Sequence, residues 1–299
     1  MSDKQAKFFK SRCIIVSLIF ILLPVHASFA NLRQYQVNVE SSNWQVSKQT
    51  RLVCELSHDI PKYGNALFIS EAAKQLNLEF TLDMLRLPGR YDSATLYSKP
   101  PQWMPGVASR KIAQMQLRKQ YDGDLPNDAA WQMLTELEKG FYPTIFYQDW
   151  LNPTDQVAVS LNASNFENAY LEFSQCISNL LPYNFDDIAY TVLSYQKNSA
   201  ELTKYSQKRL DMIGEYLKED LELELVLVAG YTDSYGGSWA NEQLSIRRAN
   251  EIRDYFSALG VDTDRIEVSG YGEKRHVAPN DNQLDRSKNR RVVIRMSKS

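Results

Sequence analysis

One arginine interrupts the apolar face of a predicted helix. The helix is expected from about Ala240 to Leu259, with Gly260 as its C-terminal cap. A spacing of four residues places Arg248 on the core-facing stripe with Leu244, Ile252 and Phe256. Its stem could pack in the core while the guanidinium reaches water. Alternatively, the guanidinium faces a pocket, where its planar fork of donors would hold a carboxylate.

A glycine-rich loop with one acidic residue leads into this helix. Residues 230–237 read Gly-Tyr-Thr-Asp-Ser-Tyr-Gly-Gly and follow a predicted buried strand. Backbone N–H groups of this loop and the dipole of the helix would together favour an anion at the start of the helix. Asp233 could be a turn residue that contacts only local backbone. If instead it converges with Arg248, the pair offers one anion and one cation. Such a pair suits a ligand that carries an ammonium and a carboxylate on one carbon.

Strands alternate with helices around these residues. An apolar run from Leu223 to Ala229 predicts a central buried strand, and a helix with an apolar stripe precedes it. Further strands are expected at Ile188–Tyr195, Ile266–Tyr271 and Arg291–Met296. This alternation favours an α/β sandwich with helices packed on a sheet.

The same region resembles a known family of wall-binding domains. The matching motifs, in order, are Gly230-Tyr231-Thr232-Asp233, Asn241, Leu244-Ser245 with Arg248-Ala249, Arg265-Ile266, Gly270-Tyr271-Gly272-Glu273 and Asn289-Arg290-Arg291. They are similar to those of the OmpA-like peptidoglycan-binding domain, and the resemblance covers roughly residues 184–298. It implies binding of the free zwitterionic end of meso-diaminopimelate in the peptide stem of peptidoglycan.

The resemblance also assigns roles to individual residues. It implies that Asp233 and Arg248 are the main contacts, supported by Thr232, Asn241 and Arg291. Three positions depart from the family pattern: Tyr231 replaces the usual His, His276 replaces a usual Pro, and Asp285 replaces a usual Gly. None removes a proposed ligand group, but Tyr231 and Asp285 could reshape the rim of the pocket.

The N-terminal half is expected to be mainly β. Alternating runs at Leu78–Met84 and Val157–Leu161 predict half-buried strands between turn residues, and Asp128–Lys139 predicts a helix. Two histidines, His58 and His276, follow the leader, one in each half, so neither a zinc site built on paired histidines nor a Ser-His-Asp triad is supported. Acidic pairs such as Glu138 and Asp149 are too common in a chain of this size to indicate a glycosidase. We expect no enzyme, cofactor or metal.

Aromatic residues are frequent in this half. Most are expected in the core, with a protein-binding face as the alternative. The six concerned are Trp103, Phe141, Tyr142, Phe146, Tyr147 and Trp150.

The first thirty residues have the pattern of a secretion signal. Four basic residues precede an apolar run from Cys13 to Val25, and Ser28-Phe29-Ala30 offers small residues for cleavage after Ala30. An uncleaved membrane anchor is the alternative, although the run is shorter than the roughly 20 apolar residues that span a bilayer. Cys13 lies at the start of the run, so no lipid anchor is expected. We therefore predict export to the periplasm.

Charge and cysteine content fit an exported protein that does not bind nucleic acid. Removing a leader with four basic residues and one acidic residue, from a chain with 34 basic and 36 acidic residues, leaves a mature charge of about −5. A net charge near zero argues against nucleic-acid coating. Two cysteines remain, Cys54 and Cys176, as one disulfide or as two buried thiols. A disulfide closing so long a loop would contribute about 4–5 kcal/mol in the chain-entropy model.

A second resemblance covers nearly the whole mature chain. Its motifs are Leu52-Val53-Cys54-Glu55-Leu56, Pro100-Pro101-Gln102-Trp103-Met104-Pro105-Gly106, Leu137-Glu138-Lys139-Gly140, Tyr147-Gln148-Asp149-Trp150 and the segment 173–181. They are similar to the MotY family of sodium-type flagellar motor proteins. The resemblance implies a disulfide between Cys54 and Cys176. It also implies an N-terminal domain that associates with a MotX-like protein and the flagellar basal body, in a ring that retains stator units.

The fold prediction is therefore α+β with two domains. Residues 1–30 form the signal peptide, 31–182 a β-rich partner-binding domain, and 183–299 an OmpA-like α/β sandwich domain that binds peptidoglycan. The alternative function is a general OmpA-like envelope tether with no connection to motility.

Overall fold

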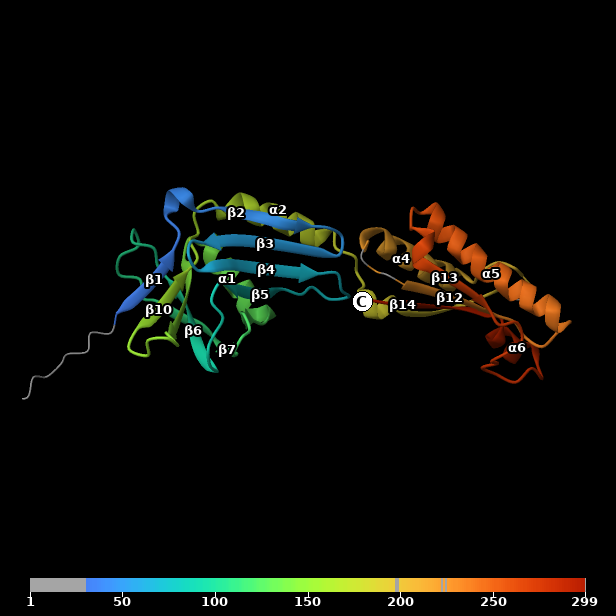
Figure 1. Ribbon diagram of the computed structural model, residues 1–299. Coiled ribbons are helices and arrows are strands. Elements are labelled where there is room, and N and C mark those ends of the chain that lie inside the picture. The colour runs from blue at the N-terminus through green and yellow to red at the C-terminus, as the bar shows by residue number, and fades with distance from the viewer. Residues whose placement is uncertain (1–30, 197–198, 222, 224, 299) are drawn as a thin grey trace, which may run out of the picture.

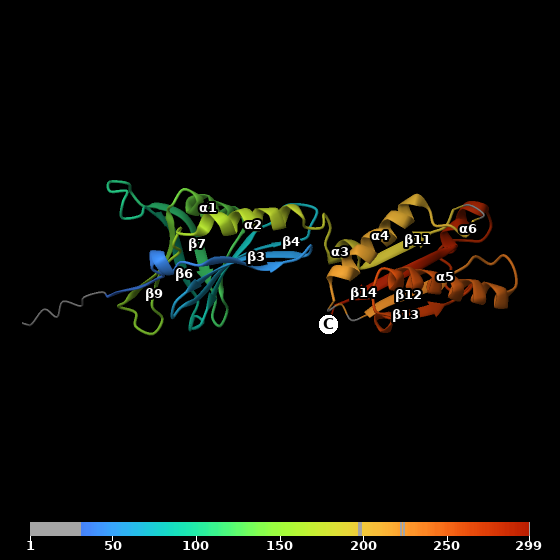
Figure 2. The ribbon, with the colours of Figure 1, turned by 90° about the horizontal axis from the view of Figure 1, so that it is seen from above.

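A computed structural model of the 299-residue chain describes residues 31–196, 199–221, 223 and 225–298. The predicted signal peptide lies outside these residues. Two lobes lie end to end in an elongated molecule (Figures 1 and 2). Each lobe has its own hydrophobic core. The fold prediction is confirmed, because a β-rich lobe is followed by a lobe of helices packed on a sheet.

The first lobe contains two five-stranded sheets. One has the order β1-β10-β9-β6-β7, in which β1 runs parallel to β10 and the other pairs are antiparallel. Its strands are β1 (Leu32–Gln36), β6 (Asp92–Lys99), β7 (Arg110–Leu117), β9 (Tyr142–Gln148) and β10 (Gln156–Ser160). The other has the order β2-β3-β4-β5-β8 and is antiparallel throughout. Its strands are β2 (Trp44–Gln49), β3 (Val53–Ile60), β4 (Gly64–Glu71), β5 (Glu79–Met84) and β8 (Gly123–Leu125).

Two helices complete the core of the first lobe. The predicted helix is present as α1 (Asn127–Glu138). A second helix, α2 (Phe166–Ser178), was not predicted, and it lies against β2 and β3. Cys54 of β3 and Cys176 of α2 form a disulfide with a Cα–Cα distance of 5.9 Å. This bond joins the second sheet to α2 across 122 residues of sequence. A short 3-10 turn, η1 (Val39–Ser41), follows β1.

The second lobe has one four-stranded sheet. Its order is β11-β14-β12-β13, in which β12 and β13 are parallel and the other pairs are antiparallel. The strands are β11 (Tyr190–Ser194), β12 (Leu225–Tyr231), β13 (Ile266–Gly270) and β14 (Arg291–Ser297). The helices are α3 (Phe185–Ile188), α4 (Lys204–Glu219), α5 (Ser238–Ala258) and α6 (Gln283–Asn289). A 3-10 turn, η2 (Thr263–Arg265), precedes β13.

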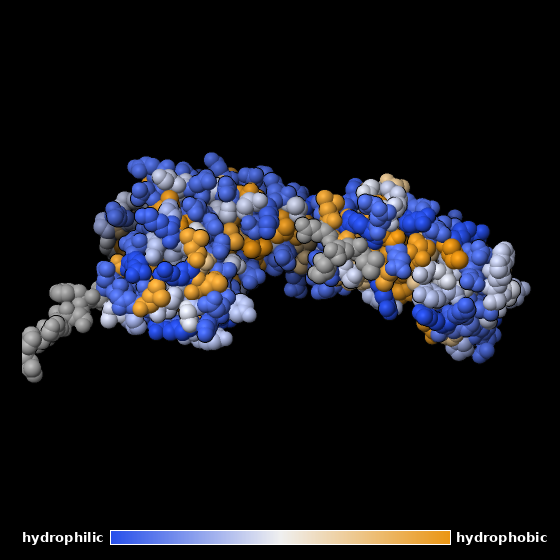
Figure 3. All heavy atoms as spheres, viewed as in Figure 1, coloured by the Kyte–Doolittle hydropathy of each residue, from blue (hydrophilic) through white to orange (hydrophobic). Residues whose placement is uncertain are grey.

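Helices α4 and α5 cover one face of this sheet (Figure 2). Helix α5 ends where predicted, and Gly260 has a φ of +93°, the left-handed conformation that closes a helix. Polar residues dominate the visible surface of both lobes (Figure 3). None of the helices in the described part of the chain is both long and apolar enough to cross a membrane.

The lobes meet at the ends of β3 and β4. Leu52 and Ala72 of the first lobe pack into the core of the second. Arg51 forms an ion pair with Glu215 of α4, and Lys74 forms one with Asp187 of α3. These contacts couple the disulfide-bonded lobe directly to the lobe that carries Asp233 and Arg248.

Candidate peptidoglycan-binding site

Close helix–sheet packing sets the position of Arg248. At Gly230 in β12, an added Cβ would lie 2.1 Å from the carbonyl oxygen of Ser245 in α5. Only glycine therefore lets the helix approach the strand this closely. Arg248 lies one turn after Ser245 and is 6% exposed. The sequence placed an arginine in a core-facing stripe, and the structure confirms that placement.

The guanidinium of Arg248 is buried and mostly unpaired. Its carbon lies 4.1 Å from the ring centroid of Tyr195, a cation–π contact. Its Nε and Nη1 atoms have no hydrogen-bond partner among the described residues. These two nitrogens are therefore shielded from water as well as unpaired. Burial lowers the pKa of Arg248 from its ordinary value; Tyr195 opposes this shift and the charge of Arg290 adds to it.

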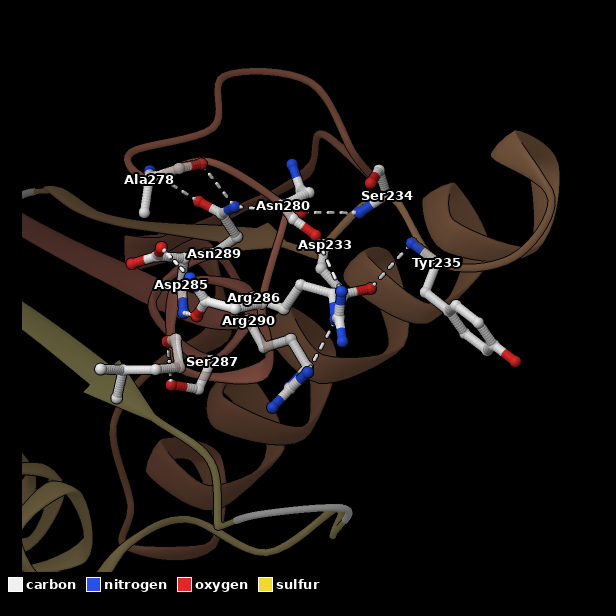
Figure 4. A network of polar contacts seen from close by, with 12 residues as sticks. Asp233, Ser234, Tyr235, Ala278, Asn280, Asp285, Arg286, Ser287, Asn289 and Arg290 are labelled. Atoms are coloured by element: carbon white, nitrogen blue, oxygen red, sulfur yellow. Dashed lines mark hydrogen bonds and ion pairs between the residues drawn. The ribbon is translucent and has the colours of Figure 1, made fainter.

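Asp233 binds a second arginine, Arg290. One oxygen of Asp233 accepts a hydrogen bond from the backbone N–H of Tyr235 at 3.0 Å. The other accepts one from Nη1 of Arg290 at 2.7 Å (Figure 4). Asp233 is therefore more than a local turn residue. Arg290, the ion-pair partner of Asp233, also contributes to the lowered pKa of Arg248, so the three side chains lie in one region, called the charged cluster below.

The loop before α6 is held by two asparagines. Asn289 accepts hydrogen bonds from the N–H groups of Val277 and Ala278 and donates to the carbonyl of Ala278. It also donates to Asn280 at 3.2 Å, and Asn280 in turn accepts from the N–H of Ser234 at 3.1 Å (Figure 4). These bonds tie the loop beside α6 to the loop that carries Asp233. Arg290 is thereby positioned by fully bonded neighbours.

Thr232 and Asn241, two further predicted site residues, are both buried. Thr232 is 2% exposed, and its N–H donates to the carbonyl of Gly272 at 2.8 Å while its hydroxyl has no partner among the described residues. Asn241 lies in the first turn of α5 and donates to Glu273 at 3.0 Å. Six buried side-chain N or O atoms of the described residues lack a partner, and Thr232, Arg248 and Arg290 contribute four of them. Unsatisfied polar atoms at such a density indicate a ligand site.

Arg291 lies on the opposite face of the sheet. Its guanidinium carbon is 4.0 Å from the ring centroid of Tyr231, and it donates to the carbonyls of Asn289 and Arg275. Tyr231 stacks in turn on Tyr271, with centroids 5.2 Å apart. The structure therefore does not bring Arg291 to the cluster around Asp233, and Tyr231 points away from that cluster as well.

Sequence reasoning missed Arg290 although the Asn-Arg-Arg motif contains it. Arg290 caps the C-terminus of α6, and Arg291 begins β14, so the two side chains leave the chain on different sides. No local signal in the sequence separates the two arginines, because their directions depend on the pairing of Arg291 with Tyr231 across β14 and β12. The other two departures from the family pattern are local: His276 contacts Asn280, and Asp285 binds Lys288 within α6.

Taken together, the fold and the charged cluster define a two-domain protein whose C-terminal half is an OmpA-like domain. Residues 194–290 match the OmpA family model, and residues 35–182 match the MotY N-terminal domain model. The sodium-type flagellar protein MotY of Vibrio parahaemolyticus is 41% identical over 290 residues, which cover 97% of this chain and 99% of that protein. The chain belongs to the MotY family of sodium-type flagellar proteins.

Two further matches cover a smaller part of the chain. The outer-membrane lipoprotein YfiB of Pseudomonas aeruginosa is 39% identical over 74 residues, or 25% of this chain and 44% of that protein. The crystal structure of the peptidoglycan-associated lipoprotein from Burkholderia pseudomallei is 26% identical, covers 36% of this chain and 89% of that chain, and has a TM-score of 0.33.

Proposed function

We propose that this protein is a periplasmic component of the flagellar motor that binds peptidoglycan through residues 183–299. The observation that carries the proposal is the group of buried, unpartnered donors on Arg248 and Arg290 beside the carboxylate of Asp233. Burying donors without partners costs free energy, about 1–3 kcal/mol each. A ligand that supplies acceptors would recover that cost.

The cluster fits a zwitterionic ligand. Guanidinium groups hold carboxylates through charge-assisted hydrogen bonds, and a carboxylate such as Asp233 can accept more than the two bonds it makes here. We assign the ligand carboxylate to Arg248, with Arg290 next to it, and the ligand ammonium to Asp233. The hydroxyl of Thr232 supplies one further polar contact, and Asn241 borders the ligand. The free end of meso-diaminopimelate in the peptide stem has this pair of charges.

Sedimentation with purified sacculi tests the assignment. Asp233→Ala and Arg248→Ala should each reduce the bound fraction to a level equivalent to at least about thirtyfold weaker binding, because losing one side of a buried charge contact costs about 2–5 kcal/mol. Arg247→Ala is the matched control, since Arg247 adjoins Arg248 on α5 and is 69% exposed. Wild-type sedimentation by the Asp233 and Arg248 variants would overturn the site.

The N-terminal lobe is proposed to provide the motor contact. We infer that residues 31–182 associate with a MotX-like protein and the basal body, and that the assembly retains stator units. The match of residues 35–182 to the MotY N-terminal domain supports this inference. A stator must push against a fixed object, and a wall-bound ring resists torque that a diffusing protein cannot. Several copies, each with one weak wall contact, would gain from avidity.

Co-purification from envelope fractions tests the proposed motor contact of the N-terminal lobe. Basal-body components and a MotX-like protein should accompany the wild-type protein, and they should also accompany the Arg248→Ala variant, because the wall site lies in the other lobe. Loss of swimming with retention of basal-body contact is expected for that variant. Normal swimming after deletion of the whole gene would instead favour a general envelope tether.

A further inference from the structure

The first lobe contains a polar groove at the opposite end of the molecule from the peptidoglycan-binding cluster. It lies where β1, β10 and β6 end and β9 begins, and its volume is about 610 Å³. That volume is within the range of about 300–1,000 Å³ typical of small-ligand sites. The 3-10 turn after β1 borders one side and the loop after β6 borders the other.

The lining of the groove is nearly uncharged. Among the described residues, Lys99 is the one charged side chain that lines it. Amides and hydroxyls supply the remaining polar groups, from Gln34, Gln36, Asn38, Gln102, Thr144 and Asn162. An amide offers donors and an acceptor at once, so it pairs well with hydroxyl or acetamido groups and poorly with an isolated ion. This composition favours a neutral ligand rich in hydroxyl groups over an anion or a cation.

Two amides at the surface of the groove, Gln34 and Gln36, still have open bonding capacity. Gln34 donates to Gln36 at 2.9 Å, and the Oε1 of Gln34 and the Nε2 of Gln36 have no partner among the described residues. On the floor, Thr144 shares a hydrogen bond of 3.0 Å with Ser160, and Asn162 donates to the carbonyl of Val37. The floor groups are therefore held in place, whereas Gln34 and Gln36 keep free donors and acceptors for a ligand.

An exposed tryptophan provides an apolar surface beside these amides. Trp103 is 61% exposed, and its ring meets the ring of Tyr142 edge-on at 6.1 Å. Its loop is stiffened by Pro100, Pro101 and Pro105, and the N–H of Met104 donates to the carbonyl of Pro101. A rigid indole held open to solvent can stack against the C–H face of a sugar ring. Stable protein–protein interfaces typically contain arginine and a large apolar centre. Neither is present in the lining of this groove.

We propose that this groove binds a neutral, N-acetylated glycan chain, with Trp103 as the stacking platform and the amides of Gln34, Gln36 and Asn38 as hydrogen-bonding partners. That the chain is a glycan strand of the cell wall rests on the proposed function of the other lobe. The protein would then hold the wall at two chemically different places, the peptide stem at one end and the sugar backbone at the other.

Tetra-N-acetylchitotetraose tests the proposal, because it is a neutral chain of N-acetylglucosamine without a peptide stem. Titration of the full-length mature protein, followed by tryptophan fluorescence and calorimetry, should give saturable binding. Trp103→Ala should weaken binding at least about tenfold, whereas Trp239→Ala should leave it unchanged, since Trp239 is 75% exposed on α5 in the other lobe. Gln34→Ala should weaken binding by a smaller factor.

A double variant separates this site from the stem site. Asp233→Ala/Arg248→Ala should bind the tetrasaccharide as tightly as wild type while losing a soluble stem peptide, and Trp103→Ala should show the reverse. The absence of saturable tetrasaccharide binding by the wild type would overturn the glycan proposal. So would equal binding by Trp103→Ala. A third outcome is that Trp103→Ala no longer co-purifies with basal-body components and the wild type does not bind the tetrasaccharide. The groove is then a protein contact and the proposal is wrong.

Discussion

Nη1 of Arg290 donates a 2.7 Å hydrogen bond to Asp233, whereas the sequence motifs singled out Arg248 as the cationic side chain of the ligand site. Both side chains of this pair are mostly buried, with 10% exposure for Asp233 and 18% for Arg290. The pair keeps Asp233 oriented while Arg248 keeps unpaired donors. The cluster therefore has two cations and one anion before a ligand arrives.

A double-mutant cycle should detect the Asp233–Arg290 contact in the unfolding free energy. Asp233→Ala, Arg290→Ala and the double variant should give a coupling energy of about 1–3 kcal/mol, as expected for a partly buried, hydrogen-bonded pair. The control is Asp285 with Lys288, whose lysine is 55% exposed; its coupling should fall below about 1 kcal/mol. Equal coupling for the two pairs in urea unfolding would show that the Asp233–Arg290 contact is unimportant.

Arg248→Met should stabilise the fold while abolishing wall binding. A buried charge without a carboxylate partner opposes folding, and methionine fills similar space without that cost. We expect the unfolding free energy to rise by about 1–3 kcal/mol, less than the full cost because the cation–π contact with Tyr195 is lost. Urea unfolding and sacculus sedimentation measure the two effects. A variant that is both destabilised and binding-competent would contradict this interpretation of Arg248.

Arg291→Leu should affect stability and leave wall binding nearly intact. Arg291 donates to the carbonyls of Asn289 and Arg275 on the face away from Asp233, so its loss leaves acceptors unpaired. Sacculus affinity should change by less than about threefold, with the melting temperature lowered. A loss as large as that of Arg248→Ala would restore Arg291 to the ligand site.

Acid should destabilise the first lobe partly through Glu136. Burial raises the pKa of this carboxyl, but hydrogen bonds from Ser98 and Lys139 and the charge of Arg110 outweigh burial, so its pKa lies below the ordinary 4.5. The unfolded chain then takes up a proton at a higher pH than the folded chain does. The stabilisation is complete above about pH 4.5 and is lost as the pH falls through the folded-state pKa.

Urea unfolding between pH 2.5 and 6 measures this contribution. Glu136→Gln should be less stable than wild type at pH 6, and its stability should fall less steeply toward acid. Identical pH slopes for the two proteins would contradict the assignment to Glu136.

Secondary-structure elements were predicted best from the sequence where local periodicity and long-range packing agree. Helix α5 was found within two residues at its start and one at its end because its buried residues recur at helical spacing. Helix α2 was missed, although Phe166, Ala169, Phe173 and Cys176 have the same spacing, because Leu171 on its outer side is 56% exposed and weakens the polar face. Arg290 was passed over because its direction depends on strand register, which is set by pairing between β14 and β12.

The strand pairing of the first lobe could not be predicted from local sequence patterns. Strand β1 pairs in parallel with β10, more than one hundred residues away in the sequence, and no local signal specifies that pairing. The groove beside Trp103 depends on it, because the groove forms where those two strands end and the neighbouring strand β9 begins. Motifs thus singled out Asp233 and Arg248, while the groove became visible only in the folded chain.

The most direct test of the central claim compares two soluble stem tripeptides, one ending in meso-diaminopimelate and one ending in L-lysine. Lysine lacks the second carboxylate, so it cannot present the zwitterionic end that Asp233, Arg248 and Arg290 are proposed to hold. Calorimetry should show binding of the diaminopimelate peptide to the wild-type protein and at least about thirtyfold weaker binding of the lysine peptide. Equal affinity for the two peptides would contradict the account.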